Sequence, residues 1–135
     1  MKSVAVKKIT PILFAREVEP CIRFWTDRLG FQKTVEVPEG NKIGFVILEK
    51  DGLELMYQSY ASAAKDVKDS AVAELARKGP TFLFVEVDDL KATIAAIHGA
   101  PVIVPVRTTF YGSTEIVVQD PAGHVVTFAQ FGASA

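Results

Sequence analysis

Residues 114–130 have the sequence TEIVVQDPAGHVVTFAQ, which is the most informative stretch for the fold. Two apolar runs, Thr114–Gln119 and His124–Gln130, flank the turn formers Asp120-Pro121-Ala122-Gly123. Short apolar runs on either side of a turn that contains Pro and Gly predict two neighbouring strands. A further apolar run upstream, Val102–Val106, predicts one more strand. The chain is therefore expected to end in three consecutive strands.

The residues before these strands predict a strand followed by a helix. Thr81–Val87 is short and apolar, and Asp88–His98 has apolar residues at helical spacing. Gly99 follows as a cap, because glycine adopts a left-handed backbone at low cost. Pro105 cannot donate a backbone hydrogen bond, which favours an edge position for the strand that contains it. The second half thus has the predicted order strand, helix, three strands.

The first half of the chain has the same order. Ile9–Phe14 predicts a strand, and Arg16–Leu29 predicts a helix with one apolar stripe. Three strand-like segments follow, at Phe31–Val37, Ile43–Glu49 and Leu53–Gln58. The repeated order favours an internal duplication of units of about 50 residues. The alternative is a single α+β sheet without a repeat.

These elements predict a single α+β domain that spans residues 1–135. We expect two repeated βαβββ modules at about 9–58 and 81–131, each of which forms a mixed sheet. The alanine-rich stretch between them, residues 59–80, predicts a helical connector that ends at Gly79-Pro80.

Charge and composition exclude several partners. Lys and Arg total 15 and Asp and Glu total 16, and the positive charges do not cluster. We therefore expect neither nucleic acid nor a membrane as a partner, because both require a basic or a long apolar surface. The start of the chain lacks the apolar core of a signal peptide, and one cysteine cannot form an internal disulfide. A cytoplasmic location is the expectation.

Several single residues are predicted to be structural. Cys21 and Trp25 lie on the apolar stripe of the first helix, so we expect both to pack in the core. Tyr57 is expected to point toward the helices, because strand residues alternate between faces. The chain has two histidines; His98 is predicted to be structural and His124 to be exposed in a turn.

Motifs along nearly the whole chain carry a family resemblance. They are Pro11-Ile12-Leu13, Phe24-Trp25 and Leu29-Gly30-Phe31 in the first half, and Val87-Asp88-Asp89-Leu90, Tyr111-Gly112-Ser113-Thr114 and Asp120–His124 in the second. In this order they resemble the glyoxalase/bleomycin-resistance/dioxygenase superfamily, also called vicinal oxygen chelate proteins. The resemblance implies two modules whose curved sheets surround a cleft. It also implies a homodimer whose clefts are built across the two-fold axis.

The resemblance further implies four metal-ligand positions, two in each module. They correspond to Thr10, Glu54, Phe82 and Thr127 in this sequence. Only Glu54 has a side chain suited to these metals, since phenylalanine cannot bind one and a neutral threonine hydroxyl is a poor ligand. We therefore expect no metal and no cofactor. Glu54 remains the candidate catalytic residue.

A metal-free cleft resembles the bleomycin-resistance type, whose members bind and sequester a ligand. Strand alternation and the loop before the seventh strand give the predicted ligand-binding residues, which are Thr10, Ile12, Glu54, Met56, Phe82, Phe84, Arg107, Tyr111 and Thr127. The predicted function is sequestration of a small, partly aromatic or cationic molecule, such as an antibiotic.

Two other hypotheses stay open. One is a lyase, isomerase or dioxygenase-like enzyme that uses Glu54 as an acid or base, with a pKa raised by apolar surroundings, or that has an unrecognised metal site. The other is an interaction domain without a small ligand. Whether the chain is an enzyme is left undecided by the sequence.

Overall fold

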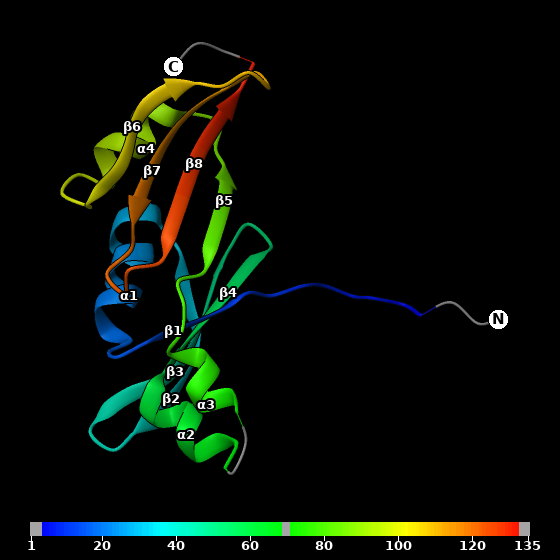
Figure 1. Ribbon diagram of the computed structural model, residues 1–135, viewed down its shortest axis with the longest axis vertical. Coiled ribbons are helices and arrows are strands. Elements are labelled where there is room, and N and C mark those ends of the chain that lie inside the picture. The colour runs from blue at the N-terminus through cyan, green and yellow to red at the C-terminus, as the bar shows by residue number, and fades with distance from the viewer. Residues whose placement is uncertain (1–3, 69–70, 133–135) are drawn as a thin grey trace.

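The computed structural model describes residues 4–68 and 71–132 and contains two four-stranded sheets (Figure 1). The first module consists of β1 (Ile12–Ala15), α1 (Glu19–Arg23), the π-helical turn η1 (Phe24–Arg28), β2 (Gln32–Glu39), β3 (Lys42–Lys50) and β4 (Leu53–Ser59). The second consists of β5 (Phe82–Glu86), α4 (Leu90–Ala96), β6 (Val102–Thr108), β7 (Ser113–Gln119) and β8 (Val125–Phe131). Helices α2 (Tyr60–Asp66) and α3 (Val72–Ala76) lie between them in the chain.

The two sheets have equivalent strand orders, β1-β4-β3-β2 and β5-β8-β7-β6. In each sheet the first strand runs parallel to the last, and the remaining pairs are antiparallel. The prediction of an α+β fold with two βαβββ modules and mixed sheets is therefore confirmed. β6 lies at a sheet edge, as Pro105 predicted. The division into residues 9–58, 59–80 and 81–131 stays a prediction.

Two turns match their sequences closely. Asp51 and Gly52 join β3 to β4 with φ angles of 51° and 80°, the left-handed conformation that a tight Asp-Gly hairpin requires. Between β7 and β8, an Asp120 carboxylate oxygen accepts the backbone N–H groups of Ala122 and His124 at 3.0 and 2.8 Å. The side chain of Asp120 thus holds the turn that joins the last two strands.

The first helix differs from its prediction in two ways. It begins at Glu19 instead of Arg16, and it changes from α to π geometry at Phe24. The wider π turn directs both Phe24 and Trp25 into the core, where each ring contacts its neighbour edge to face. An apolar helical face can include two adjacent residues, so the burial of both is compatible with the predicted apolar stripe.

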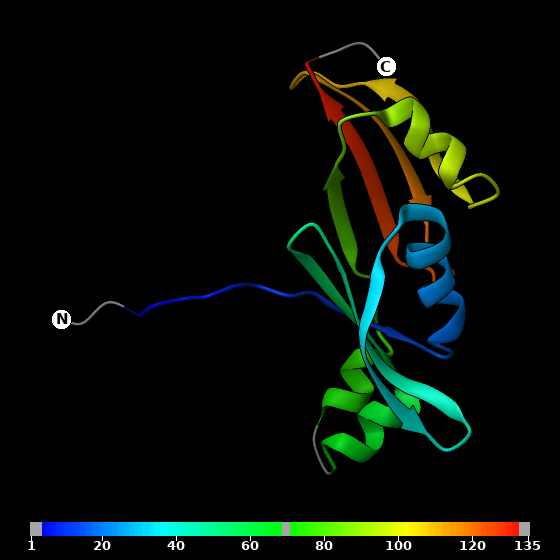
Figure 2. The same cartoon turned by 180° about the vertical axis from the view of Figure 1, so that it is seen from behind.

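One hydrophobic core serves both modules. It contains Tyr57 from β4, Trp25 from η1, Leu90 from α4 and Phe128 from β8, all fully or almost fully buried. Seen from behind in Figure 2, α1 with η1 and α4 lie on the same side of the two sheets. We call the opposite surface of each sheet, which points away from these helices, its far face.

Polar contacts also join the modules. The Trp25 indole N–H donates to the Tyr57 hydroxyl at 2.8 Å, and that hydroxyl donates to the Asp120 carboxylate. The Arg28 guanidinium donates to the carbonyls of Ala96 and His98, where α4 ends. These contacts link the first helix and sheet to the second module.

His124 is a third link, and the prediction that it is exposed in a turn is wrong. Only 4% of the residue is accessible to solvent. Its Nδ1 accepts the Thr81 N–H and its Nε2 lies 2.8 Å from the Phe14 carbonyl oxygen. Because Nδ1 accepts, Nε2 must carry the proton that it donates to Phe14. The residues that cover His124 precede it by 43 and 110 positions, so local sequence could not show this burial.

The start of the described N-terminal segment, residues 4–7, extends away from the rest of the molecule (Figure 1), whereas Lys8, Thr10 and Pro11 are hydrogen-bonded to β4. Within the described residues, no helix is both long and apolar enough to cross a membrane. The cytoplasmic location stays a prediction.

Candidate functional site

The far face of the first sheet has the predicted side chains. Along β4, Leu55 and Tyr57 are buried against the helices, whereas Glu54 and Met56 lie on the far face and are half-buried. Ile12 of β1 lies beside Met56 in the parallel pairing. The alternation predicted for this strand is confirmed, which places these three side chains on one surface.

Glu54 has two hydrogen-bond partners. The Lys8 ammonium donates to its carboxylate at 3.0 Å, and the Thr10 hydroxyl donates to the same oxygen at 3.1 Å. The hydrogen bond from Lys8 lowers the pKa of Glu54 below its ordinary value; desolvation opposes this, and the Thr10 bond adds to the lowering. The expectation of a raised pKa for Glu54 is therefore wrong, whereas its role as an acid or base stays a hypothesis.

The far face of the second sheet is aromatic. Phe82 and Phe84 point outward from β5 and are 72% and 54% exposed. Thr127 of β8 lies directly opposite Phe84 in the parallel pairing. These three predicted residues therefore share one surface.

A polar cluster on β6 and β7 contains the last two predicted residues, Arg107 and Tyr111. Both contact Glu115, which the sequence analysis did not single out: Arg107 Nη2 lies 3.3 Å from one carboxylate oxygen, and the Tyr111 hydroxyl donates to the other at 2.8 Å. The Ser113 hydroxyl donates to that second oxygen, also at 2.8 Å. Strand alternation could have placed Glu115 beside Ser113, but an isolated glutamate in an apolar strand has no distinguishing motif.

The four metal positions do not assemble a metal site. Thr10 and Glu54 are hydrogen-bonded to each other on the first sheet, and Phe82 and Thr127 lie on the second. Among residues 4–68 and 71–132, no three His, Cys, Asp or Glu side chains gather in a way that could hold a metal ion. One carboxylate, already bound by Lys8, does not fit the divalent metal that the family resemblance implies.

The predicted residues form three groups and not one enclosed cavity. Ile12 and Phe14 line a cavity of about 280 Å³ that Val72 and Leu75 of α3 close from the other side. A larger cavity, of about 730 Å³, lies between the β3–β4 hairpin and β5 and includes Phe131 but none of the predicted residues.

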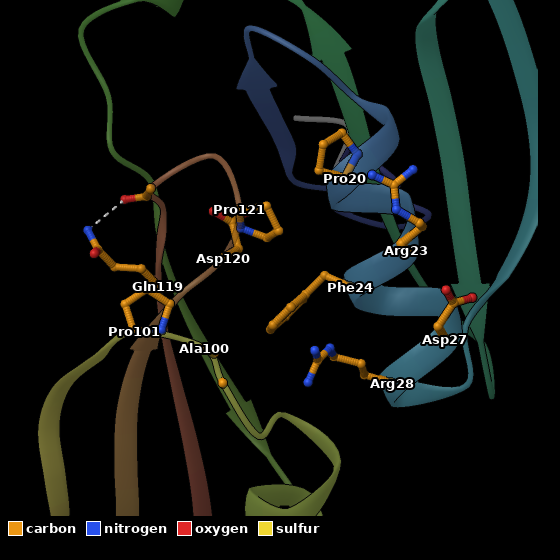
Figure 3. A pocket seen from close by; sticks show the side chains of 12 residues that line it. Pro20, Arg23, Phe24, Asp27, Arg28, Ala100, Pro101, Gln119, Asp120 and Pro121 are labelled. Atoms are coloured by element: carbon orange, nitrogen blue, oxygen red, sulfur yellow. Dashed lines mark hydrogen bonds between the residues drawn. The ribbon is translucent and has the colours of Figure 1, made fainter.

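Another groove lies on the side of the helices and has a volume of about 800 Å³ (Figure 3). Phe24 and Arg28 point into it from η1, and Pro101 and Pro121 line the opposite wall from the second module. Because Arg28 is bound to the carbonyls at the end of α4, this groove follows the contact between the modules. None of the predicted ligand-binding residues lines it.

Comparison with solved structures places the fold among known ones. TioX from Micromonospora sp. ML1 has a TM-score of 0.74 at 16% identity, over 94% of this chain and 100% of that chain. Lactoylglutathione lyase from Agrobacterium tumefaciens has a TM-score of 0.70 at 17% identity, over 93% and 95%. A glyoxalase/bleomycin resistance protein/dioxygenase from Nocardioides has a TM-score of 0.70 at 19% identity, over 98% and 89%. At these identities the likeness concerns the fold alone.

Sequence comparison supplies the family. A search of curated proteins found no match. The family model described as the Glyoxalase/Bleomycin resistance protein/Dioxygenase superfamily matches residues 6–128, which is nearly the whole chain. The chain therefore belongs to the glyoxalase/bleomycin resistance protein/dioxygenase superfamily.

Proposed function

We propose that this chain is a metal-free binding protein of the bleomycin-resistance type, which sequesters a small, partly aromatic molecule on the far faces of its sheets. The observation that carries the proposal is the exposure of Phe82 and Phe84 on β5. Large aromatic side chains on an ordered sheet surface, next to a few fixed polar groups, are typical of a ligand-binding wall.

The contacts of Glu54 favour binding over catalysis. A general base at neutral pH works best with a pKa near 7. Instead, hydrogen bonds from Lys8 and Thr10 keep the pKa of Glu54 low. The competing hypothesis, an enzyme that uses this carboxylate as an acid or base, would need the pKa of Glu54 to rise on substrate binding.

We extend the proposal to a homodimer in which a second copy completes the cleft. Exposed apolar side chains on the far faces, among them Ile12, Val37 and Phe82, support it. The predicted ligand residues of one chain also line no common cavity among those described above. A cleft between two copies would enclose a ligand that one chain leaves open to water.

Thermal unfolding in the presence of aromatic and glycopeptide antibiotics tests the binding function. A ligand that binds only the folded state adds about 2.7 kcal/mol of stability at a hundred times its Kd, so binding raises the midpoint temperature. The variant Phe84→Ala should lose this shift. Val102→Ala is the matched control, because Val102 is exposed on β6 beside the core-facing Val118. Equal shifts in both variants would contradict the proposed surface.

Elemental analysis tests the metal-free part of the proposal. Protein purified without chelator should contain no stoichiometric Zn, Ni, Fe or Mn. One ion per chain, retained on dialysis and lost in Glu54→Gln, would overturn it and support the enzyme hypothesis.

A further inference from the structure

The aromatic side chains on the far face of the second sheet form a continuous row. The ring centroids of Phe84 and Phe131 are 6.2 Å apart, those of Phe131 and Tyr111 6.2 Å, and those of Tyr111 and Phe110 5.0 Å. Their exposures are 54%, 40%, 43% and 99% in the order Phe84, Phe131, Tyr111, Phe110. The row crosses from β5 over β8 to the β6–β7 loop. Neighbouring rings along it are inclined by 51°, 40° and 88°, so a flat molecule of two or more fused rings can stack on one ring and contact the edges of its neighbours.

A fixed polar group borders this row. Glu115 is only 2% exposed, and both of its carboxylate oxygens are engaged: one by Arg107, the other by Tyr111 and Ser113. Tyr111 belongs to the row and to the polar group alike. Glu115 therefore holds both the aromatic ring of Tyr111 and the guanidinium of Arg107 in place.

Arg107 retains hydrogen-bonding capacity toward the open surface. Its side chain is 53% exposed, and within the described part of the chain Glu115 is the one hydrogen-bond partner of its guanidinium. A guanidinium has five N–H donors, so most of them remain for a ligand. Because Glu115 offsets the charge of Arg107, the pair attracts an anion less strongly than a lone guanidinium would, and its free donors can bind a neutral acceptor such as a carbonyl.

A cationic ligand has a weaker basis on this surface. Glu115 is fully engaged, and Glu54 on the other sheet is paired with Lys8. Glu86 is the exposed carboxylate on this face. It lies in the same row across the strands as Arg107, because Glu86 pairs with Ala129, Ala129 with Glu115, and Glu115 with Arg107. Three strand spacings separate Glu86 from Arg107, roughly 14 Å, so the two act on different parts of a bound molecule.

We infer that the ligand is a flat, neutral, fused-ring molecule with a carbonyl acceptor at its edge, which lies against the aromatic row while Arg107 donates to the carbonyl. Glu115 is a positioning residue that orients Arg107 and does not itself contact the ligand. This inference rests on the proposed function, since it specifies what the same surface binds. It favours a neutral ligand over the cationic one that the sequence also suggested.

Calorimetric titration with four probes tests the ligand class. The probes are 2-naphthamide, 2-naphthoate, 2-naphthylmethylammonium and the single-ring benzamide, which vary charge and ring size separately. 2-Naphthamide should bind about tenfold more tightly than the ammonium probe and more tightly than benzamide. Arg107→Met should weaken 2-naphthamide about tenfold, because a hydrogen bond to a charged group is lost.

Two further variants test whether Glu115 acts by positioning Arg107, as we infer, and whether Glu86 contacts the probe. Glu115→Gln should lower the affinity for 2-naphthamide by a similar factor. The ratio of the affinities for 2-naphthamide and the ammonium probe should also fall. A merely structural role of Glu115 would instead lower the affinity for all probes equally. Glu86→Gln should change the affinity of 2-naphthamide by less than about twofold. Thermal melting of each variant confirms that it is folded.

The outcomes distinguish this inference from the proposed function. If the protein binds the ammonium probe most tightly, or if probe affinity depends on Glu86 and not on Arg107, the inferred ligand class is wrong and the binding function stands. If Phe84→Ala and Phe110→Ala convert a dimer to a monomer and leave probe affinity unchanged, a second copy covers the row and the inference is overturned. If no probe binds the wild-type protein at millimolar concentration, the inference and the proposed aromatic binding surface both fail.

Discussion

At the scale of single residues, buried polar groups decide how firmly the modules are joined. Tyr57 is fully buried, accepts a hydrogen bond from Trp25 and donates one to Asp120. Desolvation, followed by the charge of Asp120, raises the pKa of Tyr57 well above its usual range. The phenol therefore stays protonated and can keep donating to the carboxylate at any pH at which the protein is stable.

Replacement of Tyr57 by phenylalanine should lower the free energy of unfolding by about 2–3 kcal/mol. The change leaves the Trp25 N–H and the Oδ2 atom of Asp120 without their hydrogen-bond partner, and each such group costs about 1–3 kcal/mol. Urea denaturation measures the difference. Tyr60→Phe is the control, because the recorded contact of Tyr60 is between its ring face and Arg77. Equal effects of the two changes would contradict the importance of this hydrogen-bonded group.

Cys21 should make the protein less stable at alkaline pH. Burial raises the pKa of its thiol, so the folded state keeps a proton that the unfolded state releases above about pH 8.5. The unfolded state then binds fewer protons, and stability falls as pH rises, by at most about 1.4 kcal/mol per pH unit. Urea denaturation at pH 7.5 and 9.5 under reducing conditions should show this loss in wild type and a smaller one in Cys21→Ala. Identical pH slopes would refute it.

At the scale of elements, the connector helix α2 is hydrogen-bonded to the first sheet. Gln58 of β4 donates a hydrogen bond to Ser62 of α2, and Lys65 donates one to Glu39 of β2. Gly44 of β3 lies beneath this contact. A Cβ atom placed there would be 2.6 Å from the Cβ of Glu39 and 3.1 Å from that of Ser62.

Substitution of Gly44 by alanine should therefore displace α2 from the sheet. Overpacking of a well-packed contact costs about 1–3 kcal/mol. We expect faster amide hydrogen exchange in α2, while α4 of the other module exchanges as in wild type. Mass spectrometry of exchanged peptides measures both helices in the same sample. Unchanged exchange in α2 would show that Glu39 and Ser62 accommodate the methyl group without moving the helix.

At the scale of the whole molecule, His124 holds the start of β5 against the end of β1. Replacement of His124 by alanine removes the partner of the Thr81 N–H and of the Phe14 carbonyl, and should lower stability by about 2–4 kcal/mol. His98→Ala is the control, because His98 is exposed after α4. Urea denaturation of the two variants makes the comparison. A similar loss in both would contradict the role of His124 at the junction.

The proposed homodimer predicts the mass of the protein in solution. Light scattering after size exclusion should yield twice the chain mass of 14.7 kDa. Val37→Lys and Phe82→Lys each place a charge on a far face and should give monomers, because an unpaired charge is costly to bury. Val102→Lys should remain dimeric. A wild-type monomer at all concentrations up to millimolar would overturn the dimer.

Sequence alone determined the order of elements, because strand alternation, helical spacing and turn chemistry act over a few residues. The Asp51-Gly52 hairpin, the edge position of β6 and the faces of β4 all follow from such local rules. The absence of a complete ligand set at the four metal positions was also visible in the residues themselves. These features do not depend on contacts between segments that are far apart in the sequence.

The tertiary structure alone decided which distant groups meet. Lys8 reaches Glu54 across 46 positions and lowers its pKa, and His124 is buried between Phe14 and Thr81. Glu115 binds Arg107 and Tyr111 of the same hairpin, but the folded sheet is needed to bring this cluster beside the aromatic row. The physical reason is the same in each case: burial and charge pairing depend on packing between elements, which local sequence patterns do not record.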